Sequence, residues 1–178
     1  MNNTKFERAL KEIKDIEGGY SNHPMDTGGK TKFGITERLA RAHGYKGDMK
    51  NLTWGEAKEI YKGEYWLPNH YGKIESYKIA REVFEQAINL PYIKVKNRMV
   101  LKANYHLQKS YNYTSENEIL VDGLVGPKTI KAINNCENKK LLYKFLNGFQ
   151  AKHYLELADK NDRYLAFIKG WFAKRVDF

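Results

Sequence analysis

Apolar residues recur at the spacing of an α-helix through most of this chain, and this pattern limits the possible fold more than any other feature. In residues 4–17 they fall on one helix face, at Phe6, Leu10, Ile13 and Ile16. A glycine pair then ends the helix. Similar patterns predict further helices over residues 36–45, 53–66, 76–90, 93–110, 127–136, 139–158 and 163–176. We therefore expect a mainly α fold in which amphipathic helices share a core.

Local start signals support two of these helices. Thr53 is followed three residues later by Glu56, the spacing of a capping box. Pro127 suits the first position of a helix, because that position needs no backbone N–H donor. Between the helices, residues 111–126 are rich in Asn, Ser, Thr and Glu and predict a polar loop.

The stretch IEGGYSNHPMDTGGKTKFGIT, residues 16–36, departs from the helical pattern. It holds five of the protein's 14 glycines, and Pro24 together with the pair Gly28–Gly29 marks turns. The alternation within KTKFGIT favours a short strand. We expect a small β-hairpin or an extended loop here.

The composition excludes several protein classes. Hydrophobic residues make up 42% and charged residues 29% of the chain, as in globular proteins. No apolar run approaches the roughly 18 residues of a membrane span, so we expect no integral membrane segment. The charged N-terminus lacks the apolar core of a signal peptide, which predicts synthesis in the cytoplasm. The single cysteine, Cys136, rules out an internal disulfide and is expected to be a small buried thiol.

The net charge of +10 favours a polyanionic partner such as nucleic acid, an anionic membrane or an acidic wall polymer. Between Glu85 and Glu116 there is no acid, and the basic residues there are Lys94, Lys96, Arg98, Lys102 and Lys109. This run is either a binding face or the solvated side of a helix.

Most motifs for enzymatic chemistry are missing from the sequence. The five histidines form no HExxH pattern or close pair, so no metal site is predicted. The phosphate-binding glycine patterns and the GxSxG elbow do not occur, and no cofactor is predicted. Cys136 in its polar surroundings is a poor candidate for a nucleophile.

Carboxylates remain as candidates, since glycoside hydrolysis needs a protonated acid and a second group that activates water or stabilises the cation. Glu17 follows the apolar face of the first predicted helix, where burial would raise its pKa. Asp26 comes nine residues later, and Thr31 or Thr36 could orient a water molecule. The alternative is that Glu17 is an ordinary surface residue near a helix end.

The same stretch resembles the N-terminal signature of glycoside hydrolase family 108, which comprises phage-type N-acetylmuramidases and secretion-activator proteins. The resemblance rests on the EGGY start, the Asn, Pro and Asp that follow, the Gly-Gly pair and the closing FGIT. The segment SNHPM departs from the commoner VNDP form, and Glu85 in VFEQAINL stands where Asp is commoner.

The second half resembles a predicted peptidoglycan-binding region that is often joined to that catalytic part. Its marks are Leu107–Gln108, Val121–Asp122–Gly123 and the run GPKT from Gly126 to Thr129. The closing RYLAFIKGWFAKRV is similar to the family's ending.

The resemblance implies roles for particular residues. Glu17 would be the catalytic acid, with Asp26 as its partner and Thr31 beside it, although Thr31 lies one residue short of the superfamily's usual spacing. Candidate substrate-binding residues, chosen as ring faces for sugars and as polar groups, are Tyr20, Thr36, Tyr61, Tyr65, Trp66 and Asn89. Each aromatic residue could equally belong to the core, and Asn89 could cap its own helix.

We therefore expect a lysozyme-like helical domain with a small N-terminal hairpin lobe. Residues 1–90 would be the muramidase region and residues 91–178 the peptidoglycan-binding region. The predicted activity is cleavage of the β-1,4 bond between N-acetylmuramic acid and N-acetylglucosamine, by a monomer acting on bacterial peptidoglycan in the periplasm or at the cell wall. Phage lysis or holin-dependent secretion would be its setting.

Two alternatives come from other classes. One is a non-catalytic wall-binding or secretion-accessory protein that works through VDGLVGPKT. The other is a nucleic-acid-binding protein, which charge alone suggests and no binding motif supports.

Overall fold

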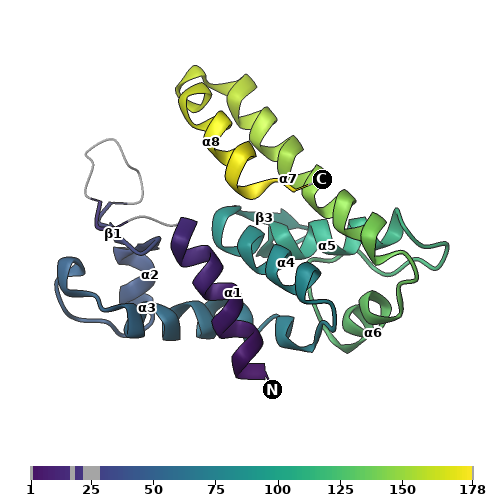
Figure 1. The fold of residues 1–178 in the computed structure, drawn as a ribbon, viewed down its shortest axis with the longest axis horizontal. Coiled ribbons are helices and arrows are strands. Elements are labelled where there is room, and N and C mark those ends of the chain that lie inside the picture. Colours follow the sequence, from purple (N-terminus) through teal and green to yellow (C-terminus); the bar gives the residue numbers. More distant parts are fainter. Residues whose placement is uncertain (1, 17–18, 22–28, 178) are drawn as a thin grey trace. The chain divides into compact units, whose positions relative to one another are not determined.

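The computed structural model describes residues 2–16, 19–21 and 29–177. Within them the chain forms eight α-helices and two small antiparallel sheets, so the prediction of a mainly α fold is confirmed (Figure 1). The chain divides into two compact units, Met1–Pro68 and Asn69–Phe178. The compact units do not test the expected division into a muramidase region and a peptidoglycan-binding region near residue 90, which stays a prediction.

Helix α1 (Asn2–Ile16) opens the first unit and confirms the first predicted helix. Its apolar stripe is buried, with Phe6, Leu10 and Ile13 each 1% exposed. The Phe6 ring packs against Trp66 with 5.5 Å between ring centroids. The Phe6 contact therefore joins α1 to η2 (Lys62–Trp66) within the first unit.

A two-stranded hairpin follows, in agreement with the small hairpin expected in this segment, and KTKFGIT forms two short strands where the alternation predicted one. Strands β1 (Thr31–Lys32) and β2 (Ile35–Thr36) pair antiparallel. Phe33 and Gly34 form the turn at φ values of 52° and 74°. Both angles are positive, which is the signature of a tight turn whose twist matches that of the strands.

The rest of the first unit is helical. Its elements are α2 (Glu37–Ala42), the 3₁₀ turn η1 (Met49–Asn51), α3 (Trp54–Tyr61) and the π-helical turn η2 (Lys62–Trp66). The predicted capping box is present: Glu56 N donates to Thr53 Oγ1 at 3.2 Å, and Thr53 N donates to Glu56 Oε2 at 2.8 Å. These reciprocal bonds satisfy backbone donors at the helix start.

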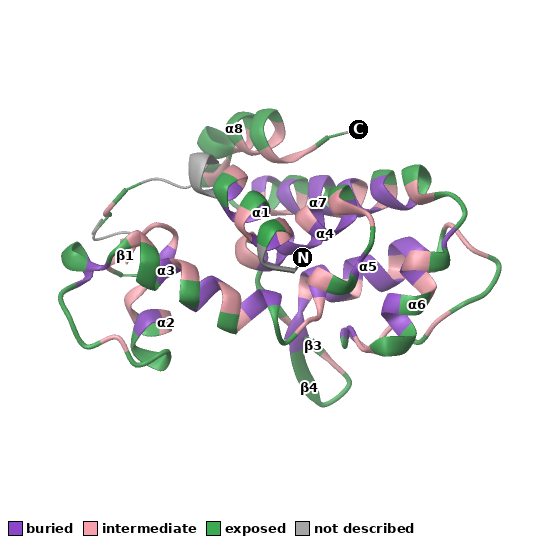
Figure 2. Cartoon of the chain, turned by 60° about the horizontal axis from the view of Figure 1, so that its bottom comes forward, coloured by how far each residue is buried: buried purple, intermediate pink, exposed green. Residues whose placement is uncertain are grey.

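Helices dominate the second unit. Its elements are η3 (Tyr71–Lys73), α4 (Tyr77–Asn89), β3 (Tyr92–Val95), β4 (Arg98–Leu101), α5 (Lys102–Asn112), α6 (Pro127–Asn135), α7 (Lys139–Lys160), η4 (Asp162–Tyr164) and α8 (Leu165–Arg175). Helices α4, α5 and α7 contact one another pairwise and carry most of the buried residues of this unit (Figure 2). Helix α8 carries none. Pro127 is the first residue of α6, as predicted.

The predicted helix over residues 93–110 is wrong in its first half. Strands β3 and β4 pair there antiparallel, with Val95 opposite Arg98, and the helix begins only at Lys102. Lys96 adopts a φ of 52°, the left-handed conformation that a tight turn requires. The β-branched residues of YIKVKNRMVL favour a strand over a helix, and its lysines are compatible with the exposed face of either element.

Candidate active site

Two of the three predicted catalytic residues, Glu17 and Asp26, lie outside the described residues. Helix α1 is described up to Ile16, the residue directly before Glu17 in the chain. The third, Thr31, is the first residue of β1. The structure therefore describes the residues that flank the two predicted carboxylates in the sequence, and not the carboxylates themselves.

Thr31 is held in place by backbone bonds. Its N–H donates to Ser21 O at 2.9 Å and its carbonyl accepts from Ser21 N at 2.8 Å. Its hydroxyl donates to Gly29 O at 3.2 Å, which leaves the oxygen lone pairs as acceptors. Residues 21 and 31 thus lie side by side, and the Thr31 side chain is partly exposed at the start of the hairpin.

Two side chains of α3 and a backbone N–H of α2 brace this hairpin. The Tyr61 hydroxyl donates to Phe33 O at 2.5 Å, at the turn residue with positive φ. The Phe33 ring meets the Trp54 ring edge-on at 5.4 Å between centroids. Thr36 Oγ1 accepts from Leu39 N at 3.3 Å and caps α2. The Tyr61 and Thr36 hydroxyls therefore make structural bonds that position the hairpin.

Burial favours the core alternative for three of the predicted sugar-binding rings. Tyr61 is 1%, Trp66 2% and Tyr65 9% exposed. Desolvation by burial, with a smaller contribution from the charge of Glu64, raises the pKa of Tyr65 to about 12. Such rings offer little face to a sugar, since stacking needs an accessible ring surface.

Tyr20 is the remaining predicted aromatic ligand, and the amine of Lys50 lies near its ring. Lys50 Nζ is 5.7 Å from the centroid of its half-buried ring. Lys32 Nζ donates to Lys50 O and so joins β1 to η1. A backbone bond from Lys50, together with the nearby charge of Lys30, lowers the pKa of Asp48. We call Lys30, Lys32 and Lys50 the basic rim.

Sequence reasoning missed the basic rim, because its lysines come from two segments that only the fold brings together. GGKTK and DMKN each look like ordinary polar loops. A rim of this kind suits an anionic substrate, since the lysine charges attract carboxylates.

Asn89, predicted to bind an N-acetyl group or to cap its helix, is engaged within the second unit. Its Nδ2 donates to Glu85 O at 3.0 Å. Its Oδ1 accepts from Arg175 Nη1 at 2.8 Å. The amide therefore ties the end of α4, in the segment VFEQAINL, to the end of α8, in the closing KRV.

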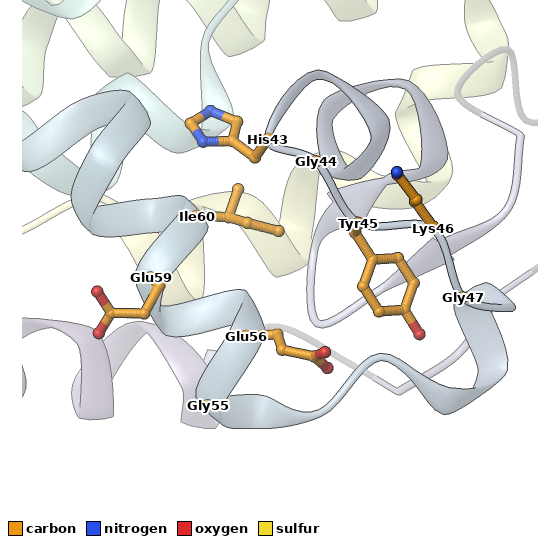
Figure 3. Close-up of a pocket in the computed structure, with 9 residues that line it drawn as sticks. All are labelled: His43, Gly44, Tyr45, Lys46, Gly47, Gly55, Glu56, Glu59 and Ile60. Atoms are coloured by element: carbon orange, nitrogen blue, oxygen red, sulfur yellow. The ribbon is translucent and has the colours of Figure 1, made fainter.

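The first unit also contains an open pocket of about 800 Å³ (Figure 3). It is lined by His43, Gly44, Tyr45, Lys46, Gly47, Gly55, Glu56, Glu59 and Ile60. At its edge, His43 Nε2 lies 2.9 Å from Glu64 Oε2. Glu56 is committed to the capping box, whose bonds from Thr53 lower the Glu56 pKa. None of the predicted site residues that the structure describes lines this pocket.

The VDGLVGPKT motif is held by hydrogen bonds from α5 in the second unit. Gln108 Nε2 donates to Asp122 Oδ1 at 2.9 Å and to Leu124 O at 3.0 Å, while its Oε1 accepts from Gly123 N at 2.7 Å. A Cβ on Gly123 would lie 2.3 Å from Val100 Cγ2. The LQ and VDG marks are therefore two halves of one hydrogen-bonded unit.

Comparison with known families assigns both halves of the chain. Residues 10–90 match the family model described as Glycosyl hydrolase 108, and residues 102–176 match the model described as Predicted Peptidoglycan domain. Residues 10–90 are a glycosyl hydrolase 108 region. Among solved structures, the "Structure of Brucella abortus SagA" is similar in fold, with 24% identity and a TM-score of 0.68. The match covers 97% of this chain and 90% of that one. A search of curated proteins found no match.

The family matches cover the predicted site. Glu17, Asp26, Thr31 and the basic rim all fall within the glycosyl hydrolase 108 region. This region also includes α4, which belongs to the second compact unit. The two matches support a glycoside hydrolase of a peptidoglycan hydrolase family, with peptidoglycan as the partner.

Neither a metal cluster nor a membrane-spanning helix occurs among the described residues. No group of three or more His, Cys, Asp or Glu side chains in that part of the chain is arranged to hold a metal ion. No helix in the same part is both long and apolar enough to cross a membrane.

Proposed function

We propose that this protein is an N-acetylmuramidase that cleaves the β-1,4 bond between N-acetylmuramic acid and N-acetylglucosamine. The observation that carries the proposal is the glycosyl hydrolase 108 match over residues 10–90, which contains both candidate carboxylates. The peptidoglycan match over residues 102–176 supports the substrate class.

In the proposed mechanism Glu17 protonates the leaving oxygen of the glycosidic bond. Asp26 positions water or stabilises the developing cation, and the Thr31 hydroxyl assists as an acceptor. The braced hairpin supports this role for Thr31, because bonds from Ser21 fix its backbone. The basic rim would attract the carboxylates of the substrate, and Tyr20 would offer its ring to a sugar.

Replacing Glu17 with Gln tests the proposal directly. A Gln side chain cannot protonate the leaving oxygen, so we expect release of reducing sugar from purified peptidoglycan to fall by about 10²–10⁴-fold. Wall binding and the circular dichroism spectrum should stay unchanged.

Glu12→Gln is the matched control, because it makes the same change on α1. Glu12 forms an exposed ion pair with Arg8, at 3.3 Å, so the variant should retain full activity. The assignment is wrong if Glu17→Gln clears walls as fast as the wild type.

The bond that is cut can be identified from the products. Mass spectrometry of reduced fragments should show N-acetylmuramic acid at the reducing ends. N-acetylglucosamine at those ends would assign a glucosaminidase instead and would refute the muramidase proposal.

The proposed setting is phage lysis or holin-dependent secretion, with the enzyme acting at the cell wall. We expect co-expression with a holin to cause lysis, measured as loss of culture turbidity, and the Glu17→Gln variant to prevent it. Lysis that depends on this protein but is equally fast with Glu17→Gln would contradict the proposed setting.

The second candidate is a non-catalytic wall-binding protein. The peptidoglycan match over residues 102–176 favours it independently of the catalytic region. Binding of the wild-type protein to walls without any release of reducing sugar would establish it.

A further inference from the structure

A second, polar groove of about 760 Å³ lies entirely within the second unit. Its walls come from the end of α5, the loop after it, helix α6 and the connection from α6 to α7. All of its lining residues fall in the predicted peptidoglycan domain. The volume is within the range of about 300–1,000 Å³ that is usual for sites of small ligands.

Charges of both signs line this groove, and they have no partners in the described structure. Lys128 and Lys131 come from α6, while Glu116 and Glu137 come from the two connecting segments. All four side chains are exposed. Within the described part of the chain, none of the four makes a hydrogen bond or an ion pair. They are therefore available to an external ligand that carries both carboxylate and ammonium groups.

Hydrogen bonds fix the loop wall of the groove. Asn112 clamps the loop from both sides: its Nδ2 donates to Ile119 O at 2.9 Å, and its Oδ1 accepts from Ile119 N at 3.0 Å. Gln108 holds the later part of the same loop through Gly123 and Leu124. A wall that is already held by hydrogen bonds lowers the ordering cost of binding.

The helical wall is fixed in a similar way. Lys139 Nζ donates to Asn134 O at 2.7 Å and to Cys136 O at 3.1 Å, which holds the connection after α6. Asn134 also bonds the backbone of Lys73 and Glu75, at 2.9 and 2.8 Å. The two walls thus present their charges on a preformed frame.

The groove does not suit sugar rings. Tyr111 is the one aromatic residue among its described lining residues, and this side chain is only 7% exposed. Its hydroxyl accepts a bond from Ser115 Oγ at 3.3 Å. A glycan site usually offers an open ring face, and this groove offers charges and amides instead.

We propose that this groove binds the peptide arm of peptidoglycan. That arm carries carboxylates, which the two lysines would pair with, and a free side-chain amine, which would donate to the two glutamates. The inference rests on peptidoglycan as the partner in the proposed function. It adds a second recognition site, directed at the peptide and separate from the carboxylates that cut the glycan.

The test uses the full chain carrying Glu17→Gln, so that hydrolysis does not consume the ligand. The probe is a soluble stem peptide with a free diamino-acid side chain, and its binding is followed by calorimetry and by chemical shifts. We expect Lys128→Glu/Lys131→Glu to weaken binding by about tenfold or more, since two attractive contacts become repulsive. The double variant Lys144→Glu/Lys169→Glu changes the net charge equally at exposed positions outside the groove, and should bind like the parent.

The glutamates give a second, independent signature. Glu116→Gln/Glu137→Gln should weaken binding of the free-amine peptide but leave binding of the same peptide unchanged when its side-chain amine is acetylated. Equal losses for groove and control lysine variants would overturn the proposal, because they would indicate non-specific charge attraction. Unaltered peptide binding in all groove variants would overturn it as well.

The outcome can be separated from that of the proposed function. If the wild-type chain releases reducing sugar but the peptide does not bind in the groove, the hydrolase proposal stands and the groove proposal fails. If the peptide binds as expected and no reducing sugar is released, the groove proposal stands and the muramidase proposal fails.

Discussion

Gly123 shows how one residue can be required by space and by backbone angle together. It has a φ of +77°, and an added Cβ would lie 2.3 Å from Val100 Cγ2. We expect Gly123→Ala to lower the free energy of unfolding by about 2 kcal/mol or more. The added methyl group must displace the buried Val100 side chain, and alanine is strained at this positive φ. Urea unfolding followed by circular dichroism would measure this.

Gly148→Ala is the matched control for this prediction. Gly148 lies inside α7 with no atom within 4 Å of the position of an added Cβ. Alanine there should raise helix stability by about 0.5–1 kcal/mol. If both substitutions had the same sign of effect, the close contact at Val100 would not be the cause.

Residue-level chemistry was partly predictable from the sequence. The reciprocal bonds of Thr53 and Glu56 form as the spacing indicates, since a capping box needs only one turn of helix. The burial of Tyr61 was not predictable. Its ring lies at a helical position where either a core or a sugar contact would fit the pattern, and only the packed neighbours decide between them.

At the level of elements, the β1–β2 hairpin depends on a side chain from α3. The Tyr61 hydroxyl donates to the carbonyl of Phe33, whose φ of 52° is unfavourable for a non-glycine residue. Tyr61→Phe removes the hydrogen bond to Phe33, so we expect it to lower the free energy of unfolding by about 1 kcal/mol. We also expect it to slow wall hydrolysis. Thermal unfolding and release of reducing sugar would measure both effects.

Tyr45→Phe provides the comparison within the same unit. The Tyr45 hydroxyl donates to Asp48 O at 2.8 Å in an exposed position, so its loss should change stability by less than about 0.5 kcal/mol. An equal effect of the two substitutions would mean that the bond to Phe33 adds nothing to the hairpin.

Element boundaries were predicted well where a local signal marks them. Pro127 begins α6, and Thr53 accepts a bond from Glu56 N at the start of α3. The β3–β4 hairpin was missed, because a lysine, Lys96, adopts the positive φ for which glycine is the usual signal.

At the scale of the molecule, burial of a carboxylate should make stability depend on pH. Glu82 is 0% exposed, and desolvation raises its pKa from 4.5 to about 7, against the opposing effects of Gln86 and Arg81. Between pH 4.5 and pH 7 the folded state therefore keeps a proton on Glu82 that the unfolded state has released. The contribution of Glu82 is fully present below pH 4.5 and is lost as the pH rises through 7.

Comparing the wild type with Glu82→Gln isolates this contribution. Burial lowers the pKa of His106 to about 3 and that of His153 to about 4, and both add an opposite slope that is common to the two proteins. The difference in urea midpoint, wild type minus variant, should fall from about pH 4.5 to about pH 8. A constant difference over that range would refute the raised pKa.

The net charge of +10 predicts how the whole protein responds to salt. Affinity for anionic walls should fall as sodium chloride rises from about 0.05 to 0.5 M, because screening shortens the range of the attraction. Co-sedimentation of the Glu17→Gln variant with purified walls would measure it. Binding that is insensitive to salt would show that uncharged contacts dominate.

Local signals in the sequence were enough to predict the helical class, most helix starts and ends and the N-terminal hairpin. They also predicted the family of the region in which the candidate carboxylates lie. These features depend on residues within one or two turns of the chain, or on short motifs that can be recognised as letters. Three other features required the folded chain: the burial of particular aromatic rings, the bonds from Gln108 to the VDG loop, and the basic rim of Lys30, Lys32 and Lys50. Burial and charge clustering depend on which surfaces meet in space, and residues distant in the sequence supply those surfaces.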